Sequence, residues 1–340
     1  MSNLLLPEEF IHSSGTIFDV RSPGEFNNGH IPGAINLPLF SNDERAIIGT
    51  LYKQQGQKAA ISLGLQIAGP KLSDFVSQAQ SHLSEKTLAK IHCWRGGMRS
   101  GAMSWLLSFA GFPTATLRGG YKSFRNWALS SFKIPYQFFI LGGMTGSGKT
   151  AILRALKSIG EQTLDLEAIA NHSGSSFGVI GKCGFQPTQE QFENEIAGQL
   201  SKMHVSRPIW IEDESRLIGC CSIPPALFDQ MRNAPLFIID VPMQERVERL
   251  LNEYGNADPK LLIEATSRLS KRLGGLRTKE IIEAIQRGYL QEAMEIILQY
   301  YDSAYSHTLT RRPPLFAKLE GNHISAEEWA ERIRQMITPH

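Results

Sequence analysis

The sequence has few cysteines and no long hydrophobic run. Its four cysteines, Cys93, Cys183, Cys220 and Cys221, form no paired framework and no Cys-x-x-Cys motif, which argues against a disulfide scaffold and against a zinc site. No apolar stretch approaches the roughly 18 residues that a membrane-spanning helix needs, and the N-terminus lacks the basic region and apolar core of a secretory signal. We therefore expect a cytoplasmic protein with reduced thiols and no membrane contact.

The chain also lacks a strong charge of either sign. Its net charge is +2 over 340 residues, so no global basic field marks it as a nucleic-acid binder. A surface for nucleic acid would have to be local, and residues 268–279 offer one, with five cations and no carboxylate. Such a run either contacts a phosphate backbone or forms a solvated basic face, and the sequence leaves both open. The length suffices for two domains.

One loop of the first 133 residues carries the features of a reactive thiol. Cys93 follows a short apolar segment and precedes two glycines, Gly96 and Gly97, which we expect at positive φ with their amides turned inward. Arg95 and Arg99 supply positive charge. A loop of this kind, running into a helix N-terminus, lowers the pKa of a cysteine and favours the nucleophilic thiolate. The sequence therefore predicts Cys93, Arg95 and Arg99 as a catalytic group.

Strands and helices alternate along both halves of the chain, which indicates parallel α/β sheets. In the first half we expect strands at 16–20, 89–92 and 114–117 and helices at 72–82 and 101–109. Pro135 separates this part from the second, where strands at 136–141, 208–215 and 236–240 alternate with helices. We expect domains at 1–133 and 134–340, the second ending in a mostly helical region.

The second half contains a complete G-x-x-x-x-G-K-T motif between an expected strand and an expected helix, the context that supports a P-loop. Its amides bind a β-phosphate, its lysine neutralises charge and its threonine hydroxyl ligates Mg²⁺. The expected phosphate-binding residues are Gly143, Thr145, Gly146, Ser147, Gly148, Lys149 and Thr150.

Three carboxylates, Glu212, Asp213 and Glu214, end the expected strand at 208–215. This is the place for the acidic metal partner of a P-loop. We predict Thr150 and Asp213 as metal ligands, with Glu212 as the alternative. Pairing of the acidic strand end with Arg216 is the competing interpretation.

The first half resembles the rhodanese domain family, whose loop cysteine carries sulfur. The matching residues are Asp19-Val-Arg21, Glu25-Phe, Gly29-His-Ile-Pro-Gly-Ala34, the Cys93 loop and Leu117-Arg-Gly-Gly-Tyr121. The loop is one residue longer than in common rhodaneses. His92-Cys-x5-Arg99 has the spacing of cysteine phosphatases and suggests a phosphate-like donor or product. A cysteine phosphatase or a sulfurtransferase fused to a nucleotide-binding module is therefore the alternative function.

The whole chain resembles the bacterial tRNA 2-selenouridine synthase family. The resemblance rests on the rhodanese-like and P-loop units in this order and on segments 43–58, 94–100, 117–122 and 212–216. It implies a rhodanese-like parallel-sheet domain followed by a P-loop NTPase-like α/β domain with a helical C-terminal part.

That resemblance also implies the activity. Members of the family convert 2-thiouridine at the tRNA wobble position to 2-selenouridine with selenophosphate, through an S-geranyl intermediate made from geranyl diphosphate. The expected partners are tRNAs of the Lys, Glu and Gln type and a selenophosphate-supplying enzyme. We expect Cys93, Arg95 and Arg99 to handle selenophosphate and the P-loop to bind the prenyl diphosphate, with Mg²⁺ as a possible cofactor.

Overall fold

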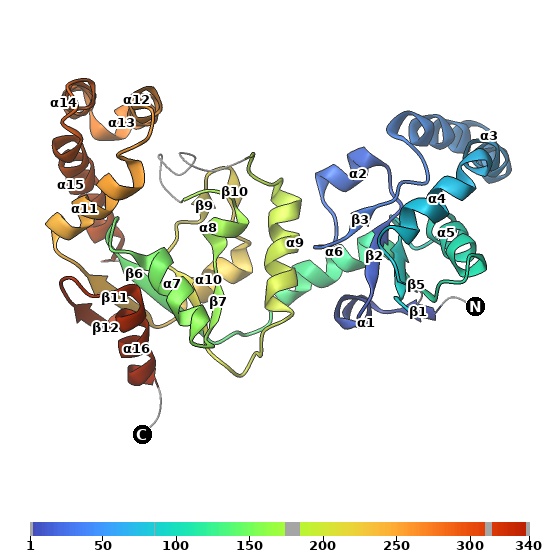
Figure 1. Ribbon diagram of the computed structural model, residues 1–340, viewed down its shortest axis with the longest axis horizontal. Helices are drawn as coiled ribbons and strands as arrows, with labels where there is room; N and C mark the ends of the chain where they lie inside the picture. Colours follow the sequence, from blue (N-terminus) through green and yellow to red (C-terminus); the bar gives the residue numbers. More distant parts are fainter. Residues whose placement is uncertain (1–2, 85, 174–183, 310–314, 338–340) are drawn as a thin grey trace. The chain divides into compact units, whose positions relative to one another are not determined.

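The computed structural model describes residues 3–84, 86–173, 184–309 and 315–337 (Figure 1). Cys183 lies outside these ranges. The chain forms two compact units. The first comprises Met1–Ser131 and Glu193–Gly198, and the second comprises Phe132–Phe192 and Gln199–His340.

The first unit is built on five parallel strands in the order β1-β5-β4-β2-β3. The strands are β1 (Asn3–Leu5), β2 (Thr16–Asp19), β3 (Ile35–Asn36), β4 (Ala89–His92) and β5 (Thr114–Leu117). The central strand β4 is buried along its whole length and delivers Cys93 at its carboxyl end. Ligands of open α/β sheets bind outside this end of the strands, so the fold places the thiol where such sites occur.

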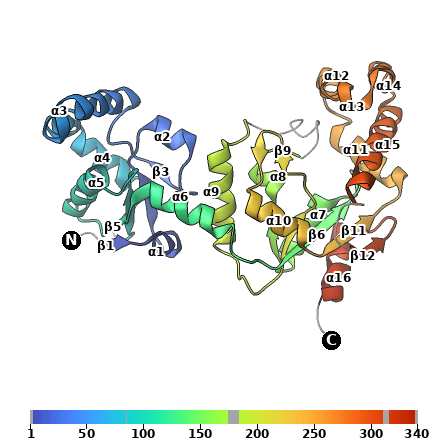
Figure 2. The same cartoon turned by 180° about the vertical axis from the view of Figure 1, so that it is seen from behind.

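The helices of the first unit are α1 (Pro7–His12), α2 (Pro23–Asn28), α3 (Asn42–Ala68), the 3₁₀-helix η1 (Gly69–Lys71), α4 (Leu72–Gln80), α5 (Met98–Phe109) and α6 (Gly120–Ser131). α3, α4 and α5 cover one face of the sheet, and α1 and α6 cover the other (Figures 1 and 2). α5 begins three residues before the expected helix start, because Gly97 is its N-cap and the cysteine loop itself ends in helical turns.

The second unit also has five parallel strands, in the order β12-β11-β6-β8-β7. The strands are β6 (Phe138–Gly143), β7 (Gln162–Leu164), β8 (Ile209–Glu212), β11 (Leu236–Asp240) and β12 (Leu315–Glu320). A separate antiparallel pair joins β9 (Leu217–Ile218) to β10 (Cys221–Ser222). The expected strand at 236–240 is confirmed, and the one at 208–215 is shorter, because the chain leaves the sheet after Glu212.

The helices of this unit are α7 (Lys149–Ser158), α8 (Leu166–Ile169), α9 (Gln189–Leu200), α10 (Pro225–Asn233), α11 (Met243–Tyr254), α12 (Pro259–Arg268), α13 (Ser270–Leu273), α14 (Gly275–Gln286), α15 (Leu290–Leu309) and α16 (Ala326–Ile337). The middle of α9 groups with the first unit. α7 and α16 pack on one face of the sheet and α10 on the other (Figures 1 and 2). α11 to α15 form a helical layer with its own apolar core.

These two parallel-sheet units confirm the α/β class expected from the sequence, including the helical C-terminal part. Within the part of the chain that the structure describes, no helix is both long and apolar enough to cross a membrane.

Candidate active site

The sulfur of Cys93 lies within hydrogen-bonding distance of two groups at the start of α5. The amide of Gly97 donates to Sγ at 3.4 Å, and the hydroxyl of Ser100 lies 3.3 Å from Sγ. Gly96 has φ 66°, as expected, but Gly97 does not: its φ is −105°. The expectation of positive φ at both glycines was therefore wrong for Gly97, whose role is to cap the helix with an amide aimed at the thiol.

These contacts favour the thiolate. Burial by itself raises the pKa of Cys93, but hydrogen bonds from Ser100 and Gly97 and the charge of Arg99 outweigh it, so the pKa lies below its ordinary value. The neighbouring His92 contributes no positive charge, because burial lowers its pKa to about 4. The anion is thus stabilised by the loop and by Arg99 rather than by an imidazolium.

The two predicted arginines have different surroundings. Arg99 donates to the carboxylate of Glu25 at 2.9 Å, and Arg45 lies 3.7 Å from the same carboxylate. Two guanidinium groups therefore share one negative charge beside the cysteine loop. Arg95 is exposed, and the structure records no contact between it and Cys93. Its role stays a prediction.

The Gly-Gly-Tyr segment at 119–121 and the residue after it support the cysteine loop. The amide of Tyr121 donates to the carbonyl of Cys93 at 2.8 Å, and that of Lys122 donates to the carbonyl of Trp94 at 3.0 Å. A Cβ on Gly120, which has φ 61°, would come within 2.3 Å of the Cys93 carbonyl oxygen. The close approach therefore requires glycine, which gives the Gly-Gly-Tyr segment a physical reason.

A buried ion pair holds the neighbouring strand end. The guanidinium of Arg21 donates to Asp19 at 2.9 Å and to the carbonyl of Gly29 at 2.7 Å. It also stacks on the ring of Tyr121, 3.7 Å from its centroid. The Asp-Val-Arg motif therefore positions the turn after α2 and the residue that supports the cysteine loop.

The lowered pKa of Cys93 predicts a faster reaction with alkylating agents at low pH. We expect iodoacetamide to alkylate Cys93 at a rate that reaches its plateau at a lower pH than for a free thiol, because the anion is the reacting species. Ser100→Ala removes a hydrogen bond to the anion and is expected to slow alkylation at neutral pH by about tenfold. Rates measured from pH 5 to 10, with the distant Ser130→Ala as control, test this. Identical profiles for wild type and Ser100→Ala would contradict it.

The P-loop forms between β6 and α7 as predicted. Gly146 and Gly148 have φ 81° and 85°, conformations that glycine adopts without strain. The Lys149 ammonium donates to the carbonyl of Gly143 at 3.1 Å. The Ser147 hydroxyl is buried and has no hydrogen-bond partner among the residues that the structure describes. This loop borders a pocket of about 700 Å³ that Thr145, Gly146, Gly148, Lys149 and Thr150 help to line.

Two arginines of α11 complete this site, and motif reasoning did not find them. Arg246 donates to the carbonyl of Thr145 at 3.1 Å, and Arg249 donates to that of Ser147 at 2.6 Å. The guanidinium of Arg246 also donates a hydrogen bond to each carboxylate oxygen of Asp302, at 2.9 and 2.8 Å. Arg249 also lines the pocket and pairs with Glu245. The only available signal was the three-residue spacing of the two arginines on a helix that follows β11.

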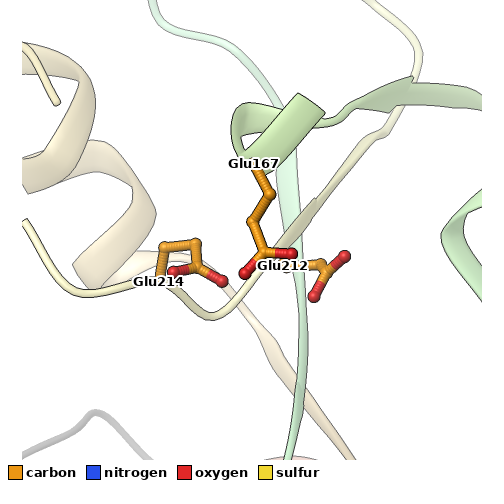
Figure 3. Close-up of side chains that lie close together, drawn as sticks. All are labelled: Glu167, Glu212 and Glu214. Carbon is orange, nitrogen blue, oxygen red and sulfur yellow. The ribbon is translucent and has the colours of Figure 1, made fainter. Parts of the chain in front are cut away.

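Three glutamates that line the same pocket lie close together (Figure 3). Glu167 comes from α8, and Glu212 and Glu214 come from the end of β8 and the loop after it. One carboxylate oxygen of each lies within 4.8 Å of the others. Glu167 falls outside every motif recognised in the sequence. Asp165, which the same α8 turn supplies, caps that helix through the amide of Ala168 and also lines the pocket.

The glutamate cluster fits an oxygen-ligated divalent cation. Burial and the neighbouring acids raise the pKa of Glu214 well above its ordinary value; burial likewise raises that of Glu212, although Lys149 and a hydrogen bond with Thr150 oppose the change. One oxygen of Glu212 is buried, and no group in the described part of the chain forms a hydrogen bond with it. A cation such as Mg²⁺ would satisfy this atom and relieve the repulsion.

Asp213, the predicted metal ligand, points elsewhere in the pocket. Its carboxylate accepts a hydrogen bond from the Tyr305 hydroxyl at 3.0 Å, and that hydroxyl accepts one from the amide of Gly143 at 3.0 Å. Thr150 instead contacts Glu212. Asp213 as a metal ligand stays a prediction, and the geometry favours Glu212, the alternative. No ion pair between Arg216 and these carboxylates is recorded among the described residues.

The glutamate cluster predicts how the stability of the protein depends on pH and on Mg²⁺. Because the pKa of Glu212 is raised in the folded state, the metal-free protein loses stability as the pH rises above about 4.5, through the folded-state pKa. Glu212→Gln removes this cost and is expected to raise Tm at neutral pH without Mg²⁺. Mg²⁺ at a hundred times its Kd is expected to raise the wild-type Tm by roughly 5 °C and that of the variant far less. Calorimetry at pH 5 and 7.5 checks both effects; equal responses to Mg²⁺ would count against this cation site.

The fold and the two sites define a class: a rhodanese-like unit with an activated cysteine, joined to a P-loop unit of NTPase type. Residues 7–126 match the model of the rhodanese-like domain, and residues 136–336 match that of the tRNA 2-selenouridine synthase AAA domain. The chain belongs to the tRNA 2-selenouridine synthase family.

Relatives of that name match along most of the chain. The protein of Bdellovibrio bacteriovorus is 34% identical over 363 residues, covering 93% of this chain and 94% of its own. That of Shewanella denitrificans is 32% identical and covers 94% and 95%. That of Aeromonas salmonicida is 35% identical and covers 86% and 87%. The family resemblance stated from the sequence is therefore confirmed.

Proposed function

We propose that this protein replaces sulfur by selenium in 2-thiouridine at the tRNA wobble position, through an S-geranyl intermediate. The observation that supports the proposal is the presence, in a chain of this family, of an activated thiol in one loop and of a P-loop that borders a pocket in the other unit. Two phosphate-bearing co-substrates, selenophosphate and geranyl diphosphate, match these two loops.

The P-loop unit serves the first step. The sulfur of 2-thiouridine attacks C1 of the geranyl group, the C1–O bond breaks, diphosphate leaves, and the base releases its N3 proton to water. Lys149, Arg249 and the loop amides bind the diphosphate and stabilise the charge that develops on it. Glu212 and Thr150 would hold a divalent cation, which would supply further charge stabilisation.

The cysteine loop serves the second step. The thiolate of Cys93 adds to C2 of the alkylated base, and the C2–S bond to the geranyl sulfur breaks. The geranyl thiolate leaves and takes a proton from water. The selenium of selenophosphate then displaces the cysteine sulfur from C2. Water cleaves the selenium–phosphorus bond and releases phosphate. Arg99 and the loop amides, with Arg95, bind the phosphoryl oxygens during this exchange.

The proposal includes the partners. The substrates are tRNAs of the Lys, Glu and Gln type, and an enzyme that makes selenophosphate supplies the donor. Three cations of the basic run, Lys271, Arg272 and Arg277, are exposed on α13 and α14. The structure records no ion pair for them among the described residues, whereas Arg268 and Lys279 pair with glutamates on their own helices. These three are the candidates for tRNA phosphate contacts. The cytoplasm, where thiols stay reduced, is the proposed location.

Incubation of purified protein with thiolated tRNA and both donors tests the proposal. Mass spectrometry of the digested nucleosides is expected to show S-geranyl-2-thiouridine with geranyl diphosphate alone and 2-selenouridine with both donors. Unaltered uridines together with hydrolysis of aryl phosphates would identify a cysteine phosphatase instead.

A further inference from the structure

An apolar groove beside the cysteine loop is not used by either step as described. It has a volume of about 860 Å³, within the range of small-molecule sites. Its walls come from α3 and α5, together with η1 and the start of α4, all within the first unit. Apolar side chains dominate the lining, and several of them are unusually exposed: Leu65, Met98 and Trp105 are 69%, 56% and 62% exposed.

A break in α3 creates the groove. Gly56 has φ 84° and ψ −177°, so the helix bends sharply there, and residues on both sides of the bend line the groove. Only glycine adopts this backbone conformation without strain. Gly49 and Gly69 also line the groove, and a Cβ built on either meets no atom within 4 Å. There is therefore room for an added side chain at both positions.

One end of the groove borders the start of α5, where the catalytic loop ends. Met98 and Arg99 begin α5, directly after the glycine that donates to the Cys93 sulfur, and both line the groove. Arg45 lines the same end of the groove, because it and Arg99 both contact the carboxylate of Glu25. An occupant would thus find the positive charge of two arginines at one end, next along the chain to the Cys93 loop, and hydrocarbon walls beyond. This combination suits an apolar chain attached to a polar, anion-bearing group.

We infer that the groove binds the hydrocarbon chain carried on the sulfur of the tRNA base while Cys93 acts on that base. The inference rests on the proposed function and assigns a binding site to its intermediate. A flexible chain of about ten carbons has no polar groups to satisfy, which matches walls made of leucine, isoleucine, methionine and tryptophan side chains. The phosphoryl group of the second co-substrate would lie at the arginine end. Binding of the chain then selects the alkylated base over the unmodified thiouridine.

Filling the groove tests this inference. Gly49→Leu places a side chain in the open space and improves helix propensity, so folding is not compromised. Gly49→Ala is the matched control, because it brings nearly the same gain in propensity with little added volume. Ala102→Leu fills the groove from the opposite wall on α5.

The first readout is calorimetric binding of the nucleosides S-geranyl-2-thiouridine and S-methyl-2-thiouridine to the full-length protein. We expect the wild type and Gly49→Ala to prefer the geranyl compound by at least about tenfold, and Gly49→Leu and Ala102→Leu to lose that preference. Equal affinities of the wild type for both nucleosides would overturn the inference. So would a preference that survives in both filled variants, since the chain would then bind elsewhere.

The second readout is conversion of tRNA that already carries the geranyl group. Gly49→Leu is expected to raise the KM of this selenation about tenfold while Cys93 alkylation by iodoacetamide stays at the wild-type rate. If the wild type selenates this tRNA and Gly49→Leu does so with the same KM, the groove has another occupant, such as a protein segment, and the inference fails while the proposed function stands. If the wild type selenates neither this tRNA nor thiolated tRNA given both donors, the proposed function itself fails.

Discussion

Cys93→Ser is expected to abolish selenation and to leave geranylation intact. Serine keeps the size of the side chain and a hydroxyl that Gly97 and Ser100 can still contact, but its oxygen is not ionised at neutral pH. The nucleophile is thereby lost, and the rate of the second step is expected to fall at least about a thousandfold. Quantification of both modified nucleosides after reaction with both donors measures this, with S-geranyl-2-thiouridine expected to accumulate.

Cys220→Ser provides the matched control for that experiment. Cys220 is an exposed free cysteine of the second unit, far along the chain from the loop. We expect this variant to selenate tRNA at the wild-type rate. Selenation that persists in Cys93→Ser would remove Cys93 from the mechanism, and simultaneous loss of geranylation would show that the two steps share one site.

Lys149→Ala is expected to have the second large effect, on geranyl transfer. The ammonium is the positive charge of the P-loop, and its removal leaves the departing diphosphate without that stabilisation. A loss of about a hundredfold to a thousandfold in the transfer rate follows from the usual size of such an electrostatic contribution. Single-turnover geranylation of thiolated tRNA measures it.

The same variant separates prenyl diphosphate binding from ATP hydrolysis. Pre-geranylated tRNA is expected to be selenated normally by Lys149→Ala, because the second step uses the other unit. Lys157→Ala, on the last turn of the same helix, serves as the control for loss of a lysine from α7. Normal geranylation with loss of ATP turnover in Lys149→Ala would refute the assignment of the P-loop to the prenyl donor.

The sequence predicted those parts of both sites that depend on contiguous residues. The P-loop motif determines its own backbone, since positive φ at Gly146 and Gly148 and a following helix N-terminus need no distant partner. The same holds for the Cys93 loop, where Gly97 and Ser100 contact the sulfur from four and seven residues away. Strands such as β11 were predicted because an apolar run of β-forming residues is buried on both faces of a parallel sheet.

What the sequence could not reveal are partners brought together by the fold. Glu25 lies 74 residues from Arg99. No pattern near either residue predicts that the Glu25 carboxylate lies between Arg99 and Arg45. Glu167 joins the glutamate cluster only because β7 lies beside β8 in the sheet. The groove depends on a bend at Gly56. Because α3 also contains Gly49 and Gly64, where the helix continues, a glycine in this sequence does not by itself mark the position of the bend.

The Tyr305 hydroxyl joins α15, a helix near the C-terminal end of the chain, to the P-loop. It accepts from the amide of Gly143, the first residue of the P-loop motif, and donates to Asp213 at the end of β8. Tyr305 belongs to α15, whose core is shared with α14 and thus with the basic run. A movement of α15 at Tyr305 would stretch those two hydrogen bonds. The position of this C-terminal helix is therefore coupled directly to the backbone at the start of the P-loop and to the acidic end of β8.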